Sequence, residues 1–214
     1  MDLHQLTTKT PLALPRRGDS TRVQVGANEL VLEAVRGGHT LLWSDGREAR
    51  RYALGLAADG DLALELRAPR LPLRIVCREL VTLVPGGRLH GYVQVPLVPT
   101  IVWQPNAGSE AVLLELAPRE LAAEWDDHEG AVFRCASSLH VRLPMRSGEP
   151  RANVPVWLRN DGDTVHAPAH LPLRLADHDL VELRGSLIVR PRRLQWTGAA
   201  WRTTTCDAAV EVKS

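Results

Sequence analysis

The sequence predicts a nearly all-β protein, built from two related antiparallel β-sandwich-like repeats that are packed in tandem. Three observations support this fold class. Apolar and polar residues alternate with a period of two in several short segments, turn-forming residues separate these segments, and one block of sequence recurs one hundred positions later. Many short strands with regularly spaced turns are typical of a sandwich or a barrel.

The alternation of apolar and polar residues is clearest at residues 62–67, 88–95 and 139–143. In the first segment every second residue is a leucine, and Glu65 and Arg67 lie among the residues between. Segments that are apolar on one side suit antiparallel sheets, which place one face on a core and the other in solvent. Turn formers such as Asp-Gly and Pro-Gly-Gly separate the segments. We therefore expect short strands connected by tight turns.

A block of thirteen residues occurs twice in the chain. Leu71–Leu83 reads LPLRIVCRELVTL and Leu171–Leu183 reads LPLRLADHDLVEL, so that seven of the thirteen positions are identical without a gap. Upstream of each block, residues 46–61 and 148–163 end in the related runs LAADGD and LRNDGD. Two matches in the same order indicate an internal duplication.

The duplication predicts two domains, a first β repeat at residues 20–117 and a second β repeat at residues 118–214. One short connector helix is expected at the start of the second repeat, over Pro118–Trp125. Proline suits the first position of a helix, and glutamate suits its first turn. Leu121 and Trp125 are four positions apart, which would place them on one face of this helix.

The composition argues against several kinds of partner. The chain has 26 basic and 25 acidic residues, and a net charge of +1 creates no overall field that would attract a nucleic acid. No stretch approaches the roughly 20 apolar residues of a membrane-spanning helix, and the N-terminal residues lack the pattern of a signal peptide. The three cysteines, Cys77, Cys135 and Cys206, fit no zinc-binding spacing and suit buried free thiols in a reducing cytoplasm. The alternative is one disulfide and a spare thiol. With the strong preference for arginine over lysine, we expect a bacterial, cytoplasmic protein.

Three strand-rich runs, at Glu79–Leu97, Glu129–Ser138 and Val156–Asp163, together resemble the prokaryotic domain-of-unknown-function family four-thirty-two. The resemblance covers most of the chain, and its motifs are strand patterns rather than catalytic signatures. It implies no activity and no functional residue. Because some members are associated with mechanosensitive channel genes, it implies at most a regulatory or accessory partner.

His166, His170 and His178 are the candidate metal ligands, with Asp177 and Asp179 nearby. Neutral imidazoles and carboxylates suit zinc or a similar divalent ion. The spacing of His166 and His170 would bring them together on a helix, but the proline between them argues against one. On a strand, residues four positions apart lie about 13 Å from each other. The alternative is that these are exposed histidines in a loop.

Two further groups could support chemistry. The acidic stretch 120–129 could supply a pair of carboxylates for acid/base work, or form a solvated connector. The basic segment Arg190–Trp196 could hold a single-stranded nucleic acid, since arginine contacts phosphates and tryptophan stacks on bases; the alternative places the tryptophan in a core or on a strand pair. No nucleophile elbow, Cys/His signature or glycine-rich phosphate loop is recognisable. The sequence therefore predicts no cofactor and argues against an enzyme.

The function expected from the sequence is that of a non-enzymatic protein-binding or scaffolding module. Such a module would meet a protein partner, or a second copy of itself, through an apolar patch or an open edge strand. The alternative is a metal- or small-ligand-binding β protein that uses His166, His170 and His178. Nucleic-acid binding through Arg190–Trp196 is a third hypothesis, which the charge balance disfavours.

Overall fold

The structure is a computed structural model, and it describes residues 8–54, 60–106, 109–127, 129–144, 149–183 and 186–206. These residues form eighteen strands and one short 3-10 helix, so the protein is nearly all β, as the sequence predicts. Within the same residues, no helix has the length and hydropathy that crossing a membrane would require.

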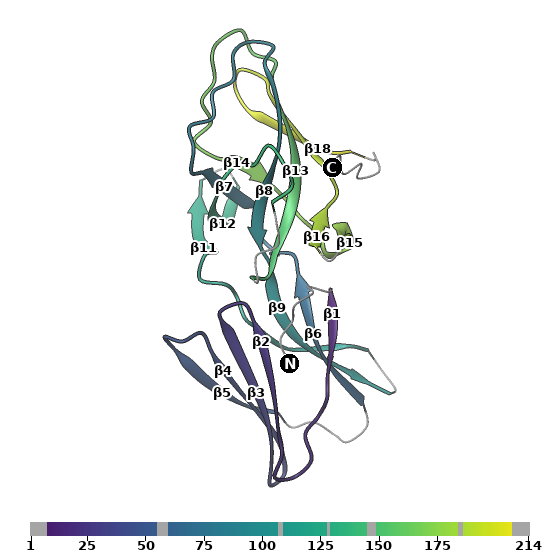
Figure 1. Cartoon of the computed structure of the whole chain (residues 1–214). Helices are drawn as coiled ribbons and strands as arrows, with labels where there is room; N and C mark the ends of the chain where they lie inside the picture. Colours follow the sequence, from purple (N-terminus) through teal and green to yellow (C-terminus); the bar gives the residue numbers. More distant parts are fainter. Residues whose placement is uncertain are drawn as a thin grey trace. The chain divides into compact units, whose positions relative to one another are not determined.

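The strands belong to two compact units, and each unit is assembled from separate stretches of the chain (Figure 1). The first unit consists of the described residues of Met1–Arg67, Val98–Leu116 and Ser147–Pro150. The second consists of those of Ala68–Leu97, Ala117–Arg146 and Arg151–Ser214. The chain therefore passes between the two units several times.

The first unit contains two antiparallel sheets of four strands each. One is a meander, in which each strand pairs with the next along the chain, in the order β2 (Ser20–Val25), β3 (Asn28–Val35), β4 (Gly38–Ser44) and β5 (Ala49–Leu54). The other has the order β1 (Lys9–Leu12), β6 (Gly60–Arg67), β9 (Val98–Pro105) and β10 (Ala111–Glu115). In Figure 1 the meander is drawn in purple to blue.

Apolar residues from both sheets form the core of the first unit. The fully buried leucines include Leu30, Leu32, Leu41, Leu62 and Leu64. Glu65 and Arg67 alternate with the leucines of β6 and keep part of their surface in solvent, so the period of two predicted for residues 62–67 is confirmed. Burying a leucine side chain stabilises the folded state by about 1.5–3 kcal/mol.

The second unit contains two sheets, and both combine antiparallel with parallel ladders. One has the order β11 (Ala122–Asp126), β12 (Gly130–Ser137), β7 (Leu73–Cys77) and β14 (Leu171–Leu173). The other contains β15 (Leu180–Leu183), β16 (Ser186–Val189), β13 (Arg151–Asn160), β17 (Arg192–Trp196), β18 (Trp201–Thr205) and β8 (Arg88–Pro96). The ladders β7–β12, β13–β16 and β13–β17 are parallel, and the other ladders are antiparallel.

The long strand β13 is the centre of the six-stranded sheet. One of its edges pairs with β8 from Arg151 to Arg159. The other edge pairs first with β16, beside residues 152–153, and then with β17, beside residues 156–160. Val156 and Leu158 of β13 are fully buried. In β8, residues 91, 93 and 95 are buried and the residues between are more exposed, which confirms the alternation predicted for residues 88–95.

The connector helix predicted at Pro118–Trp125 is not formed. The Leu121 N–H donates a hydrogen bond to the Pro118 carbonyl (3.0 Å), which closes one turn, and β11 follows directly. Every residue of β11 pairs with β12, so the strand finds its backbone partners there rather than in a preceding helical turn. Leu121 is buried whereas Trp125 is 78% exposed, so the two do not form the shared buried face expected of the helix. Tertiary pairing thus overrides the local helical preference.

The strand expected at residues 139–143 is not formed. Within this segment His140 forms an isolated bridge to Tyr92, and no ladder continues on either side. Val141, which the alternation would have placed in the core, is exposed. The backbone hydrogen bonds of this segment to β8 are limited to those between His140 and Tyr92 in the described chain.

The two copies of the recurring block both lie in the second unit, and they differ in structure. Leu71–Leu83 contains β7 and a loop, whereas Leu171–Leu183 contains β14, the 3-10 helix Asp177–Asp179 and β15. The two copies pair with each other, since β7 and β14 are antiparallel neighbours with Leu73 opposite Leu173. The structure therefore does not confirm a tandem repeat, and the division into repeats at residues 20–117 and 118–214 stays a prediction.

Candidate functional site

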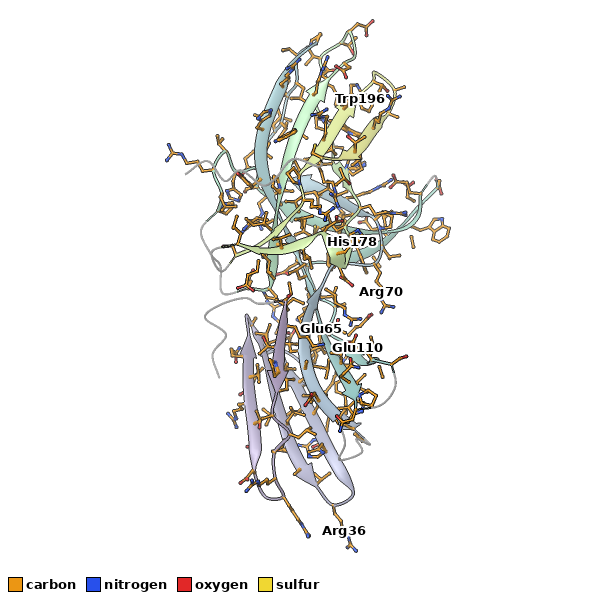
Figure 2. All side chains as sticks on the ribbon, turned by 90° about the vertical axis from the view of Figure 1, so that its right-hand side faces the viewer. Arg36, Glu65, Arg70, Glu110, His178 and Trp196 are labelled. Carbon is orange, nitrogen blue, oxygen red and sulfur yellow. The ribbon has the colours of Figure 1, made fainter. Side chains whose placement is uncertain are left out.

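The three histidines predicted as metal ligands lie in different surroundings of the second unit. His166 stacks on Trp196, with ring centroids 3.7 Å apart and 6° between the planes. His170 is half-buried just before β14, and His178 is exposed in the 3-10 helix. Figure 2 shows His178 well apart from Trp196, the stacking partner of His166. No group of three or more His, Cys, Asp or Glu side chains in the described part of the chain could hold a metal ion, so the metal site stays a prediction without structural support.

His166 belongs to a cluster of three aromatic rings, which we call the aromatic cluster: His166, Trp196 and Trp201. Trp201 meets the other two rings edge-on, with centroid distances of 5.3 and 5.7 Å. The two tryptophans are opposite each other at the end of the β17–β18 ladder, and the backbone of His166 pairs with that of Leu83. Burial lowers the pKa of His166, which favours the neutral imidazole. The cluster therefore packs the β17–β18 hairpin against the loop that contains His166, which is a structural role.

Asn160 holds together the loops near the aromatic cluster. Its Nδ2 donates to the carbonyls of Leu83 (2.9 Å) and Thr164 (2.7 Å), and its Oδ1 accepts a hydrogen bond from the N–H of Gly162 (2.9 Å). The side chain is fully buried. The Asp-Gly-Asp run at residues 161–163 is thus shaped by the residue that precedes it.

The basic segment Arg190–Trp196 does not form one surface. Successive side chains of β17 point to opposite faces of the sheet, so Arg192 and Arg193 diverge. Arg192 is buried and bonded to Asp179 at 2.5 Å, whereas the guanidinium of Arg193 lies 5.6 Å from the ring centre of Trp157. Trp196 is part of the aromatic cluster. The arginines and Trp196 are therefore not presented together.

The acidic stretch 120–129 supplies ion-pair partners. Glu120, Glu124 and Asp126 are bonded to Arg151, Arg134 and Arg74, respectively. Two of these three contacts involve β11, which they join to β12 and β7. The stretch is thus not the predicted helical connector, because half of it, Ala122–Asp126, is a strand.

β11 and residues 130–134 of β12 form an exposed hairpin at the edge of a sheet, which we call the edge hairpin. Among the described residues, β12 is the single strand that pairs with β11. Trp125 lies opposite Ala131, and Ala123 lies opposite Phe133. Phe133 is half-buried and the other three residues are exposed. One face of the edge hairpin is therefore apolar and accessible.

The other face of the edge hairpin carries charged side chains around Val132, which lies opposite Glu124 and is fully buried. Glu124 and Arg134 form an ion pair at 3.3 Å, and both side chains keep much of their surface in solvent. Asp126, at the end of β11, is bonded to Arg74 of β7. The two faces of the hairpin therefore differ: one is apolar and accessible, and the other combines charged side chains with a buried valine.

Several other edge strands contain features that hinder the addition of a further strand. Proline removes a backbone donor, and a register shift disrupts the ladder. β1 contains Pro11, β14 contains Pro172, and the ladder of β10 shifts its register between Val112 and Leu114. β11 has no proline, no lysine and no register shift, and it exposes a tryptophan.

No family model, no curated protein and no solved structure matches this chain. The resemblance to family four-thirty-two therefore stays an expectation from the sequence.

Proposed function

We propose that this protein is a non-enzymatic protein-binding module and that the edge hairpin is its binding element. The observation that supports the proposal best is Trp125, a large apolar side chain that is 78% exposed on an open edge strand. An open edge offers its N–H and C=O groups to an extended segment of another chain, and alternate side chains supply specificity. Tryptophan is also enriched among the residues that contribute most to protein interfaces.

The edge hairpin favours an extended partner segment in which apolar and basic side chains alternate. A strand added beside β11 would place one set of its side chains next to Ala123 and Trp125, and the other set next to Glu124 and Asp126. The first set would be apolar, because it would cover the indole. The second would be basic, because Glu124 keeps 40% of its side chain exposed even though it is paired with Arg134.

A second copy of this chain suits the edge less well. Antiparallel pairing of two β11 strands would bring Glu124 and Asp126 close to the same residues of the other copy. Like charges on facing strands are destabilising. The charges of β11 therefore favour a different protein over self-association.

The proposal is tested by photocrosslinking. A photoreactive phenylalanine analogue replaces Trp125 in the full-length chain, the protein is irradiated in a lysate of cells that produce it, and the crosslinked peptides are sequenced. We expect segments that alternate apolar residues with lysine or arginine. The additional substitution Ala123→Lys, which repels a basic strand and protects the edge, should remove these crosslinks.

Val181 is the matched control position, because it is an exposed apolar residue (44%) on another edge strand, β15. The analogue at position 181 should not capture the same segments. Equal capture at positions 125 and 181, or crosslinks only between two copies of this chain, would contradict the proposal.

A further inference from the structure

One face of the six-stranded sheet gathers arginines around a tryptophan. The register places His90, Trp157 and Arg193 side by side on β8, β13 and β17. Two residues further along β13, Arg159 lies between Arg88 of β8 and Gln195 of β17. Arg202 of β18 lies next to Gln195. We call this surface the basic face, and its members are Arg88, His90, Trp157, Arg159, Arg193 and Arg202.

The basic face is turned toward solvent. Residues of the same strands with the opposite parity, such as Val156, Leu158 and Leu194, are fully buried and belong to the core. Four members of the face are exposed, and Trp157 and Arg159 are half-buried. The sheet therefore presents Trp157 to solvent among the arginines of the neighbouring strands.

The positive charge of the basic face is only partly neutralised. Asp161 forms an ion pair with Arg159. Within the described ranges, no acidic side chain forms an ion pair with Arg88, Arg193 or Arg202. The near-neutral net charge is a sum over the whole chain, which includes acidic side chains elsewhere, such as those of the edge hairpin. It therefore does not describe the electrostatic potential at the basic face.

Trp157 is held on the sheet from both sides. The imidazole of His90 stacks against the indole with centroids 5.6 Å apart and 28° between the planes, and the guanidinium of Arg193 lies 5.6 Å from the ring centre. Both contacts come from neighbouring strands, so the orientation of the indole is fixed by the ladder. A fixed aromatic ring among arginines is how open β surfaces hold unpaired bases.

We propose that the basic face binds single-stranded nucleic acid, with a base stacked on Trp157 and phosphates contacted by the surrounding arginines. A duplex would hide its base faces from the indole, and a sulfated polysaccharide has no aromatic ring to stack on it. The inference goes beyond the proposed protein binding and uses a different sheet. It also differs from the segment suggested by the sequence, because Arg88, His90, Trp157 and Arg159 come from other strands.

The test is fluorescence anisotropy of a short fluorescein-labelled oligothymidylate titrated with the full-length protein at several salt concentrations. Trp157→Ala should weaken binding on the order of tenfold, the loss expected for one stacked base. Arg193→Ala and Arg202→Ala should each weaken binding, and each should reduce the slope of log affinity against log salt by about 0.7. Arg193 and Arg202 are exposed residues, so their variants test the proposal even where Trp157→Ala fails to fold.

The matched control is Arg50→Ala. Arg50 also lies over a tryptophan, 5.8 Å from the ring centre of Trp43, but it belongs to the first unit and is paired with Glu48. Its removal should leave the affinity unchanged. Two results would overturn the proposal: no binding at low salt, or binding that heparin matches and that does not change in Trp157→Ala, which would reveal a general polyanion surface.

Discussion

The side chains of Asp179 and Arg192 form a buried ion pair, with 2.5 Å between Asp179 Oδ2 and Arg192 Nη2. Only 6% and 3% of these residues are exposed. Arg192 also donates hydrogen bonds to the carbonyls of Arg174 and Arg190, and Asp179 accepts one from the N–H of Ala176. The pair thus joins β17 to the 3-10 helix and satisfies most of its own polar groups.

Asp179→Ala is expected to lower the free energy of unfolding by about 3–5 kcal/mol, because it leaves Arg192 buried without its counter-ion. Urea unfolding followed by circular dichroism measures the change. The control is Glu29→Ala, which removes an exposed partner of Arg22 and should cost no more than about 1 kcal/mol. A loss in Asp179→Ala that is as small as in this control would show that the pair contributes no more than a surface ion pair.

Asn160→Asp is expected to destabilise the second unit, although the two side chains have nearly the same shape. The aspartate would keep an acceptor for the Gly162 N–H but would turn an ionised oxygen toward the carbonyls of Leu83 and Thr164. Loss of the two donors should cost about 1–3 kcal/mol at neutral pH.

The pH dependence of the Asn160→Asp variant provides its internal check. Burial and the two carbonyls would raise the pKa of the introduced carboxyl in the folded state. The penalty should therefore be present while the group is ionised and should shrink as the pH falls and the carboxyl is protonated. A penalty that is the same at pH 7 and pH 4 would contradict this role of Asn160.

The all-β fold could be predicted because alternation is a local property. In residues 62–67 and 88–95 the alternation with neighbouring residues indicates which face of the sheet each side chain occupies. Burial in β6 and β8 follows that pattern. The parallel ladders of β13 could not be predicted, since β16 and β17 lie about 30 residues further along the chain and nothing local specifies their partner.

The edge hairpin and the basic face were missed for different reasons. Residues 122–126 alternate with a period of two, but Leu121 and Trp125 also have helical spacing, and five residues are too few to distinguish the two patterns. The basic face depends on the register of three separate ladders, which brings Arg88, Trp157 and Arg193 together from distant positions. No single stretch of sequence contains that information.

Glu65→Gln is expected to remove a pH-dependent part of the stability of the first unit. Burial by itself would raise the pKa of Glu65, but hydrogen bonds from Lys9 (2.7 Å) and Arg67 (2.6 Å) outweigh it and hold the pKa below the ordinary value of 4.5. Glu110 is the second acceptor of Arg67, and Figure 2 shows the two glutamates near each other.

Because the pKa of Glu65 is lowered on folding, its contribution is complete above pH 4.5 and is lost as the pH falls through the folded-state pKa. The wild type should exceed Glu65→Gln in unfolding free energy by on the order of 1 kcal/mol at neutral pH. This difference should shrink between about pH 5 and pH 3, as measured by urea unfolding at each pH. A constant difference across that range would contradict the prediction.

Cys135 is expected to resist alkylation in the folded protein. Burial raises the pKa of its thiol to about 11, from an ordinary value of 9.0, and the thiolate is the reactive form. At pH 8 iodoacetamide should therefore modify Cys135 about a hundredfold more slowly in the folded than in the unfolded chain. Mass spectrometry of the digested protein measures both rates, with the half-buried Cys206 as a reference in the same sample. Equal rates for Cys135 with and without urea would show that β12 opens readily.

The stability of the second unit is expected to depend on the protonation of His166. Burial in the aromatic cluster lowers its pKa below the ordinary 6.5, so the folded state prefers the neutral ring that stacks on Trp196. His166 binds a proton more readily in the unfolded chain than in the folded chain. The stabilisation from the stacked neutral ring is therefore complete above pH 6.5 and declines as the pH falls below it. Heteronuclear NMR of the imidazole should give a titration midpoint below 6.5, and His166→Gln should unfold with a weaker pH dependence between pH 7.5 and pH 5.5. A midpoint at or above 6.5 would mean that the ring is hydrated and that the stack opens in solution.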